Sequence, residues 1–163
     1  MYKLKMRKIQ FLILISSNIK MNADAIYKTL LLKVEKKLGN ETTFSNDLYN
    51  VAKSLLGNKF SGIFTADKLP RLTKTQPYAI VNLDSSWEEG SHWIALAKSG
   101  KKIVFYDSFG RPNTSILPLL KGGNVVNTEE DAEQEIQETN CGQRSIAWLL
   151  LFDRYGDKMA MKV

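Results

Sequence analysis

The sequence predicts an α+β fold, in which a mixed central β-sheet is flanked by helices. Two stretches near the start, residues 22–38 and 42–56, repeat apolar side chains at helical spacing. Three short β-branched stretches follow between residues 78 and 107. A long apolar stretch near the end, residues 140–156, predicts a buried central helix. With 163 residues the chain is long enough for one domain and an extension.

The first two helices are defined by their apolar faces and their stops. In the first, an apolar residue recurs every fourth position (Ile26, Leu30, Val34 and Leu38). Gly39 and Asn40 end it. In the second, Ser45 or Asn46 is the expected N-cap residue and Gly57 the stop. Residues 60–70 contain a glycine and a proline and are expected to be irregular.

Three strands are expected next, over residues 78–84, 92–97 and 101–107. Ser99 and Gly100 form the tight turn between the second and the third, which therefore make a β-hairpin.

The region after the hairpin has weaker signals. Residues 114–120 are expected to form a short helix and residues 124–127 a short strand. Residues 128–138 carry six carboxylates and are expected to be an exposed loop or a frayed helix.

Charge is distributed unevenly along the chain. Residues 1–38 hold nine of the 23 basic residues but only two of the 17 acidic ones. This segment therefore has a net charge of +7, whereas residues 39–163 have a net charge of −1. Attraction to a polyanion such as DNA is therefore expected in residues 1–38. The apolar run at residues 9–15 is too short to span a membrane and lacks a clear signal-peptidase site. We expect no membrane partner and no secretion, and residues 9–15 to pack on the main domain as a strand or helix.

The sequence has one cysteine and one histidine. A single cysteine excludes an intramolecular disulfide and fits a reducing compartment or a virion interior. A structural zinc site of the usual composition is also not expected, because it needs four cysteine or histidine ligands.

The candidate chemistry lies at the start of the apolar helix and at one end of the hairpin. Cys141 follows Asn140, the expected N-cap, so the amides and positive dipole end of the helix favour its thiolate. His92 opens one hairpin strand and Asp107 closes the next, which brings them to the same end of the sheet. A cysteine, a histidine and an aspartate placed together form a nucleophile, its base and the orienting acid.

Each of these residues also has an ordinary structural explanation. Lone cysteines are usually small buried apolar residues, and an aspartate at a strand end is often a turn residue. From the residues alone the catalytic and the structural interpretations remain about equally supported.

The segments GSHWIALA, IVFYDSFGRP and NCGQRSIAWLL together resemble the adenovirus-type maturation cysteine proteases (adenain-like). That family shares the papain-like, Ulp1-type fold of the SUMO-specific proteases, with the nucleophile at the N-terminus of the central helix. The order histidine, acid, glutamine, cysteine is specific to it. The likeness spans residues 42–152 and is greatest to proteases of virophages and Polinton-type viruses.

The resemblance assigns roles to particular residues. It implies Cys141 as the nucleophile, His92 as the general base and then acid, and Asp107 as the residue that orients His92. Trp93 would pack beside the imidazole. The family's oxyanion-hole glutamine lies six or seven residues before the cysteine, which favours Gln134; the alternative, Gln137, lies four residues before it.

The resemblance also implies a function and a place. We expect a cysteine endopeptidase, residues 41–163, that cleaves viral capsid or precursor proteins after glycine, in the virion and the viral factory of an infected cell. A tunnel beside Trp93 and the Trp87 loop would select the glycine. Residues 1–40 form a basic extension that we expect to contact DNA.

No cofactor is expected, and activation by DNA or by a peptide is left open. A disulfide-tethered activating peptide is ruled out, because the second cysteine that such a peptide requires in this family is absent.

Two other functions stay open. A ubiquitin- or SUMO-like isopeptidase would use the same active site, since such enzymes also cut after glycine. A basic nucleic-acid-binding virion protein without catalysis would explain the charge of the first 38 residues.

Overall fold

The computed structural model describes residues 2–112, 120, 124–129 and 131–163, with the backbone alone for residues 2–12 and 16. Its centre is a five-stranded mixed sheet in the order β1-β2-β3-β4-β5. The strands are β1 Phe60–Thr65, β2 Tyr78–Asn82, β3 Trp93–Ser99, β4 Lys102–Tyr106 and β5 Asn124–Asn127. The outer pairs β1–β2 and β4–β5 are parallel, whereas β2–β3 and β3–β4 are antiparallel.

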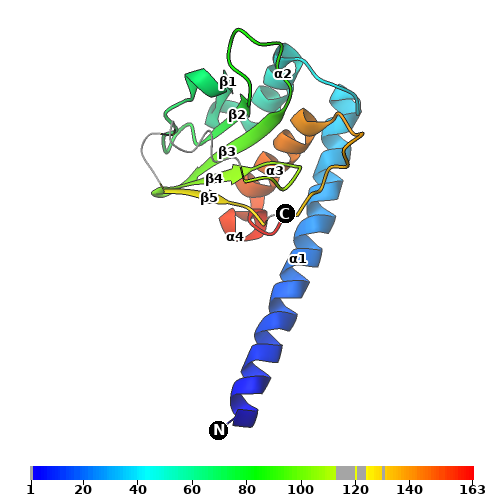
Figure 1. Cartoon of the computed structure of the whole chain (residues 1–163), viewed down its shortest axis with the longest axis vertical. Coiled ribbons are helices and arrows are strands. Elements are labelled where there is room, and N and C mark those ends of the chain that lie inside the picture. Colours follow the sequence, from blue (N-terminus) through cyan, green and yellow to red (C-terminus); the bar gives the residue numbers. More distant parts are fainter. Residues whose placement is uncertain (1, 113–119, 121–123, 130) are drawn as a thin grey trace.

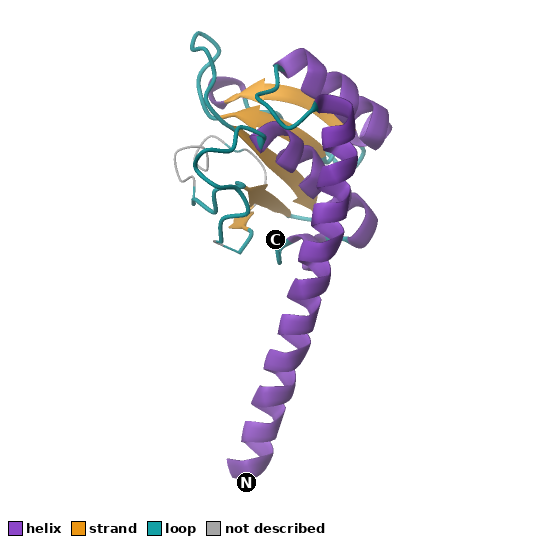
Figure 2. Cartoon of the chain, turned by 90° about the vertical axis from the view of Figure 1, so that its right-hand side faces the viewer, coloured by secondary structure: helices purple, strands orange, loops and turns teal. Residues whose placement is uncertain are grey.

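Four α-helices accompany the sheet in the described part of the chain. They are α1 Tyr2–Leu38, α2 Ser45–Leu56, α3 Cys141–Tyr155 and α4 Asp157–Ala160. Short 3₁₀ turns, η1 Gly57–Lys59 and η2 Ala66–Lys68, flank β1. In Figure 1, α3 lies between the sheet and α1, and Figure 2 shows the helices gathered on one side of the strands. The predicted α+β class, a mixed sheet flanked by helices, is confirmed.

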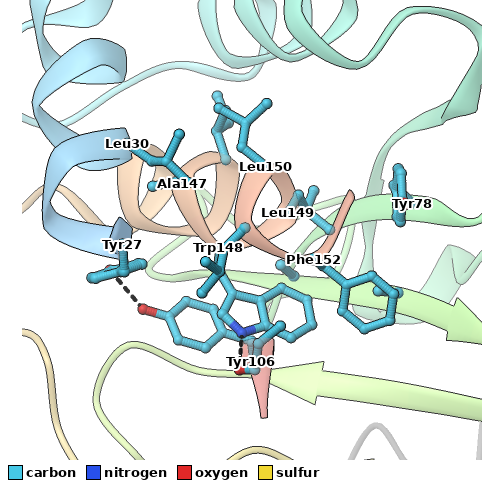
Figure 3. Packing of buried hydrophobic residues seen from close by; sticks show 14 of the residues in the cluster. Tyr27, Leu30, Tyr78, Tyr106, Ala147, Trp148, Leu149, Leu150 and Phe152 are labelled. Carbon is cyan, nitrogen blue, oxygen red and sulfur yellow. Dashed lines mark hydrogen bonds between the residues drawn. The ribbon is translucent and has the colours of Figure 1, made fainter. Parts of the chain in front are cut away.

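The main core lies between the sheet and the helices. Side chains alternate along each strand, so Tyr78 and Ile80 of β2 face the helices while Ala79 and Val81 face the opposite way. Trp148 of α3 is fully buried, stacks on Tyr106 of β4 at 5.1 Å and donates a hydrogen bond to the Ala160 carbonyl (Figure 3). The apolar run at residues 146–152 is buried throughout, as a central helix requires.

A second, smaller core covers the other face of the sheet. It contains Ile94 and Leu96 of β3, Phe105 of β4, and Leu72 from the connection between β1 and β2. Because both faces of the sheet are covered, the sequences of its central strands are continuously apolar and do not alternate between apolar and polar residues.

The first helix is longer than the sequence predicts. Residues 9–15 and 22–38 belong to one continuous helix, α1. Its C-terminal half is part of the main core through Tyr27, Leu30 and Val34, and Tyr27 hydrogen-bonds Tyr106 between their hydroxyls at 2.8 Å (Figure 3). Its N-terminal half extends away from the sheet (Figures 1 and 2), so packing of residues 9–15 on the main domain is not observed. The domain boundary at residue 40 stays a prediction.

Several expected boundaries are corrected. Residues 60–65 form edge strand β1 rather than an irregular segment, because they pair with β2 despite Gly62. Ser45 is the first residue of α2, the N-cap position falls on Phe44, and no side chain caps this helix. The predicted strand at residues 124–127 is confirmed. The expected helix at residues 114–120 lies outside the described residues except for its last position.

Two expected absences concern membranes and disulfides. None of the described helices is long and apolar enough to cross a bilayer. Cys141 is the only cysteine and is free and buried.

Candidate active site

Three of the four residues predicted to carry chemistry line one cleft of about 730 Å³. His92, Gln134 and Cys141 all contribute to its wall. The rest of the wall comes from the start of α2, from the end of β1 and the turn after it, from the loop between β2 and β3, from Phe109, and from residues between Gln134 and Cys141. Five separate parts of the sequence therefore form the cleft.

His92 and Asp107 meet at the end of the β3–β4 hairpin, as their positions at its strand ends predict. Both side chains are buried, and His92 Nε2 lies 2.6 Å from Asp107 Oδ1. The Leu83 amide donates to the His92 carbonyl at 3.0 Å, which extends the β2–β3 pairing and fixes the backbone of His92. Since Nε2 is engaged by the carboxylate, Nδ1 is the ring nitrogen left for the thiol.

Cys141 is the first residue of α3. The first amides of a helix have no intrahelical acceptor, so the Cys141 amide is free to meet a negative charge. Gly142 next to it is required by packing, because an added Cβ would lie 2.6 Å from Cδ2 of the fully buried Leu48. The close approach of α2 thus depends on this glycine and fixes where the thiol stands.

Asn140 occupies the N-cap position, but its side chain does not cap the helix. Its amide nitrogen donates to Glu35 of α1 at 2.9 Å, and its oxygen accepts from Arg144 Nε at 2.8 Å. The predicted position is therefore right and the predicted role wrong, because tertiary partners take the side chain that would have capped the helix.

The electrostatics favour a thiolate next to an imidazolium. Burial by itself raises the pKa of the Cys141 thiol. Hydrogen bonds from His92 and from the Trp93 amide, together with the charge of His92, outweigh burial, so the net effect is a lowered pKa. Burial lowers the pKa of His92, but Asp107 and Cys141 together hold it above its ordinary value. For Asp107, the contacts with His92 and the Phe109 amide overcome burial and lower its pKa.

Two side chains, Phe109 and Arg111, stack in turn over His92. The Phe109 ring lies 4.8 Å from the imidazole, and the Arg111 guanidinium lies over that ring at 4.9 Å. Arg111 Nε also donates to Asp107 Oδ2 at 3.1 Å. The ring that packs on the imidazole is therefore Phe109, whereas Trp93 was expected there.

The two tryptophans near the site differ in position. Trp93 lines the cleft, and its indole N–H donates to the Thr43 carbonyl at 3.3 Å. Trp87 is 77% exposed and does not line the cleft. Other residues of the loop that carries Trp87, such as Ser86 and Glu88, do line the cleft together with Trp93, and selection of glycine by a tunnel there stays a prediction.

The two candidate glutamines are separated by burial. Gln134 is buried and lines the cleft with Cys141, whereas Gln137 is exposed and lies outside the cleft wall. Gln137 donates to the neighbouring carboxylate of Glu135. Of the two, only Gln134 is placed where an amide N–H can face the cleft.

Two further side chains, missed from the sequence, hold the segments around Cys141. Arg144 is buried and pairs with both carboxylate oxygens of Glu138 at 2.9 and 3.1 Å. Gln143 donates to the carbonyls of Gly39 and Glu41 and accepts from the Thr43 hydroxyl. Arginine and glutamine inside an apolar helix were the available signal, because buried polar groups need partners.

No group of three or more histidine, cysteine, aspartate or glutamate side chains suited to a metal occurs in the residues that the structure describes.

Comparison with known proteins gives no independent support. The chain matches no protein-family model, and no curated protein is significantly similar to it.

Proposed function

We propose that the chain is a cysteine endopeptidase that uses Cys141, His92 and Asp107. One observation carries the proposal: a buried imidazole is held at 2.6 Å by a carboxylate and lines the same cleft as a thiol at a helix N-terminus. That arrangement lowers the pKa of the thiol and raises that of the imidazole. A structural cysteine has no need of either effect.

The proposed reaction begins with the thiolate. Cys141 Sγ attacks the scissile carbonyl carbon, and the carbonyl oxygen becomes an oxyanion that accepts from the Cys141 amide and from Gln134 Nε2. The His92 imidazolium gives its Nδ1 proton to the leaving amine as the C–N bond breaks. His92 then takes a proton from water, whose oxygen attacks the thioester, and keeps that proton as the thiolate leaves, which releases the acid product and restores the thiolate–imidazolium pair.

The substrate assignment rests on the resemblance to adenovirus-type maturation proteases. We propose viral capsid or precursor proteins cut after glycine, in the virion or viral factory, with residues 1–38 contacting DNA. A ubiquitin- or SUMO-like isopeptidase would use the same chemistry, and the choice between them depends on the substrate.

The proposal is tested by active-site labelling followed by a substrate panel. A vinyl sulfone peptide with glycine before the warhead should label the wild type and fail to label Cys141→Ala. Labelling of His92→Ala should fall by about 100-fold or more, because general base catalysis contributes 10²–10⁴-fold. Ser99→Ala, at the far end of β3, is the matched control and should label normally.

The rate of cleavage of a viral capsid precursor is then compared with the rate of cleavage of ubiquitin-type fusion proteins. The faster reaction assigns the substrate class. Absence of labelling and cleavage in the folded wild type, with DNA binding intact, would instead favour the non-catalytic nucleic-acid-binding function.

A further inference from the structure

The turn after β4 connects the acid at Asp107 to the glutamine in the cleft. The Gly110 amide donates to the Asp107 carbonyl at 2.8 Å and closes the turn. Gly110 has a φ of +64°, and an added Cβ would lie 2.8 Å from the Asp131 carbonyl carbon. The turn therefore sits directly against the loop that carries Gln134, and a larger residue at this position would push the two apart.

Ser108, inside this turn, makes three hydrogen bonds to that loop. Its carbonyl accepts from the Glu133 amide at 3.0 Å and from the Gln134 amide at 2.9 Å. Its hydroxyl donates to Gln134 Oε1 at 2.6 Å. Ser108 is fully buried and Gln134 is nearly so, which keeps water from replacing these bonds.

The hydrogen bonds of Gln134 fix which way its amide points. Oε1 accepts from Ser108, and Nε2 donates one hydrogen to the Glu138 carbonyl at 2.6 Å. Flipping the amide would set Oε1 against that carbonyl oxygen, which cannot donate. The second Nε2 hydrogen has no protein acceptor within the described residues and remains for a group bound in the cleft.

We propose that Ser108 is a positioning residue that orients the Gln134 amide toward the oxyanion. This inference rests on the proposed function. Ser108 touches no reacting atom; it acts by holding Oε1 so that an N–H, and not a carbonyl oxygen, faces the developing charge. A donor aimed in advance stabilises the transition state without reorganisation.

The test compares Ser108→Ala, Gln134→Ala and the double variant, with rates divided by the concentration of titratable active thiol. Gln134→Ala should lower kcat roughly 100-fold, as loss of an oxyanion donor does, and Ser108→Ala roughly 10-fold. In the Gln134→Ala background, Ser108→Ala should change kcat by less than about twofold, because both act through one amide. Ser99→Ala, whose hydroxyl donates to Asp157 at 3.0 Å, is the matched control and should keep the wild-type kcat.

Two probes separate positioning from general damage. A peptide aldehyde forms an oxyanion on binding, so Ser108→Ala should weaken its binding by about the same factor as it lowers kcat. Iodoacetamide requires the thiolate but no oxyanion, so its rate should stay within about twofold of wild type. Ser108→Thr keeps the hydroxyl and should recover most of the lost kcat.

A measurement on the unmodified protein does not depend on any Ser108 variant folding. Binding of the aldehyde should shift one of the two Gln134 Nε2 proton resonances strongly, because the other proton is already bonded to Glu138. Equal shifts of both protons, or of neither, would contradict the inference. A wild-type kcat in folded Ser108→Ala would also contradict it, as would additive losses of kcat in the double variant. Failure of the wild type to cleave or react would refute the proposed function instead.

Discussion

His92 takes its properties from neighbours on two other segments, the turn after β4 and the start of α3. Asp107 holds one ring nitrogen, Cys141 interacts with the other, and the Phe109 ring covers the imidazole. Arg111 then fixes Phe109 and Asp107 together. The ring therefore cannot rotate without losing several contacts, which is what an oriented general base requires.

The pH dependence of alkylation follows from the shifted pKa values. The pKa of Cys141 is lowered and that of His92 is raised from 6.5, and both shifts favour the thiolate–imidazolium pair over the neutral thiol and imidazole. Iodoacetamide labelling should rise with pH at an inflection below about 8.5, the ordinary value for cysteine. In His92→Ala the inflection should move upward, because only the Trp93 and Gly142 amides then oppose the effect of burial on the Cys141 pKa. An unchanged inflection in that variant would show that His92 does not activate the thiol.

Glu133 is a second residue whose surroundings change its chemistry. Among the residues that the structure describes, none hydrogen-bonds its buried Oε2. Burial first, and then the charges of Asp131 and Asp24, raise its pKa to about 8, while Lys20 and Arg144 oppose the shift. Its neutral, protonated form is therefore favoured at neutral pH.

Glu133→Gln should reveal that shift through stability. The folded-state pKa is about 8 against an ordinary 4.5, so the folded protein binds more protons between these pH values and loses stability as pH rises through them. The glutamine variant stays neutral. It should match the wild type at pH 4 and exceed its free energy of unfolding by about 1–3 kcal/mol at pH 9. Urea denaturation at both pH values measures the difference, and parallel pH profiles would contradict it.

At the scale of single elements, the start of α3 depends on how closely α2 approaches it. Gly142 allows that approach, since its missing Cβ leaves room for the fully buried Leu48. Helix propensity alone would favour alanine over glycine here by about 1 kcal/mol, so packing opposes propensity at this position.

Gly142→Ala is expected to lower the free energy of unfolding by about 1–3 kcal/mol, the usual cost of overpacking, and to slow alkylation of Cys141. Thermal and urea unfolding with a labelling assay measure both effects. The double variant Gly142→Ala/Leu48→Ala removes the clash, so its loss should be smaller than the sum of the single losses. Additive losses would show that Leu48 is not the obstacle.

At the scale of the whole molecule, α1 has two unlike halves. The C-terminal half carries core residues such as Tyr27, Leu30 and Val34. At its middle, Lys20 pairs with Glu129 at 3.0 Å and with Asp131 at 2.6 Å. The N-terminal half extends beyond the domain (Figure 1) and holds four of the nine basic residues of the first 38.

Truncations should separate these halves. Deleting residues 2–18 should leave the melting temperature within a few degrees of wild type, because the core side chains of α1 remain. Deleting residues 1–38 should prevent folding, since it removes that part of the core. Calorimetry and circular dichroism measure both.

The shorter truncation also tests the proposed DNA contact. It should weaken salt-dependent DNA binding, because the lost lysines and arginine neutralise phosphates. A charge-reversed variant of the same four basic residues, with the helix intact, is the control. Unchanged binding in both would place any DNA contact elsewhere.

Much of the architecture could be predicted because it is encoded locally. The hairpin of β3 and β4, the stop at Gly39 and the apolar run of α3 follow from periodicity and turn residues over short windows. Strand β1 was missed because its partner is distant in the sequence: Phe60 of β1 pairs with Tyr78 of β2, 18 residues later. The start of α1 was missed because nothing in the local sequence shows that the helix extends beyond the part that packs on the core.

The sequence alone determined the identity of the candidate chemistry: one cysteine heading a buried helix, and one histidine and one aspartate at the end of one hairpin. Adjacent antiparallel strands bring such ends together, so this part needed no knowledge of the whole fold. Only the tertiary structure decided that Gln134 and not Gln137 lines the cleft with Cys141, that Ser108 and Glu138 hydrogen-bond its amide, and that Phe109 and Arg111 stack beside the imidazole. These contacts join loops whose mutual position is set by packing, which no short stretch of sequence encodes.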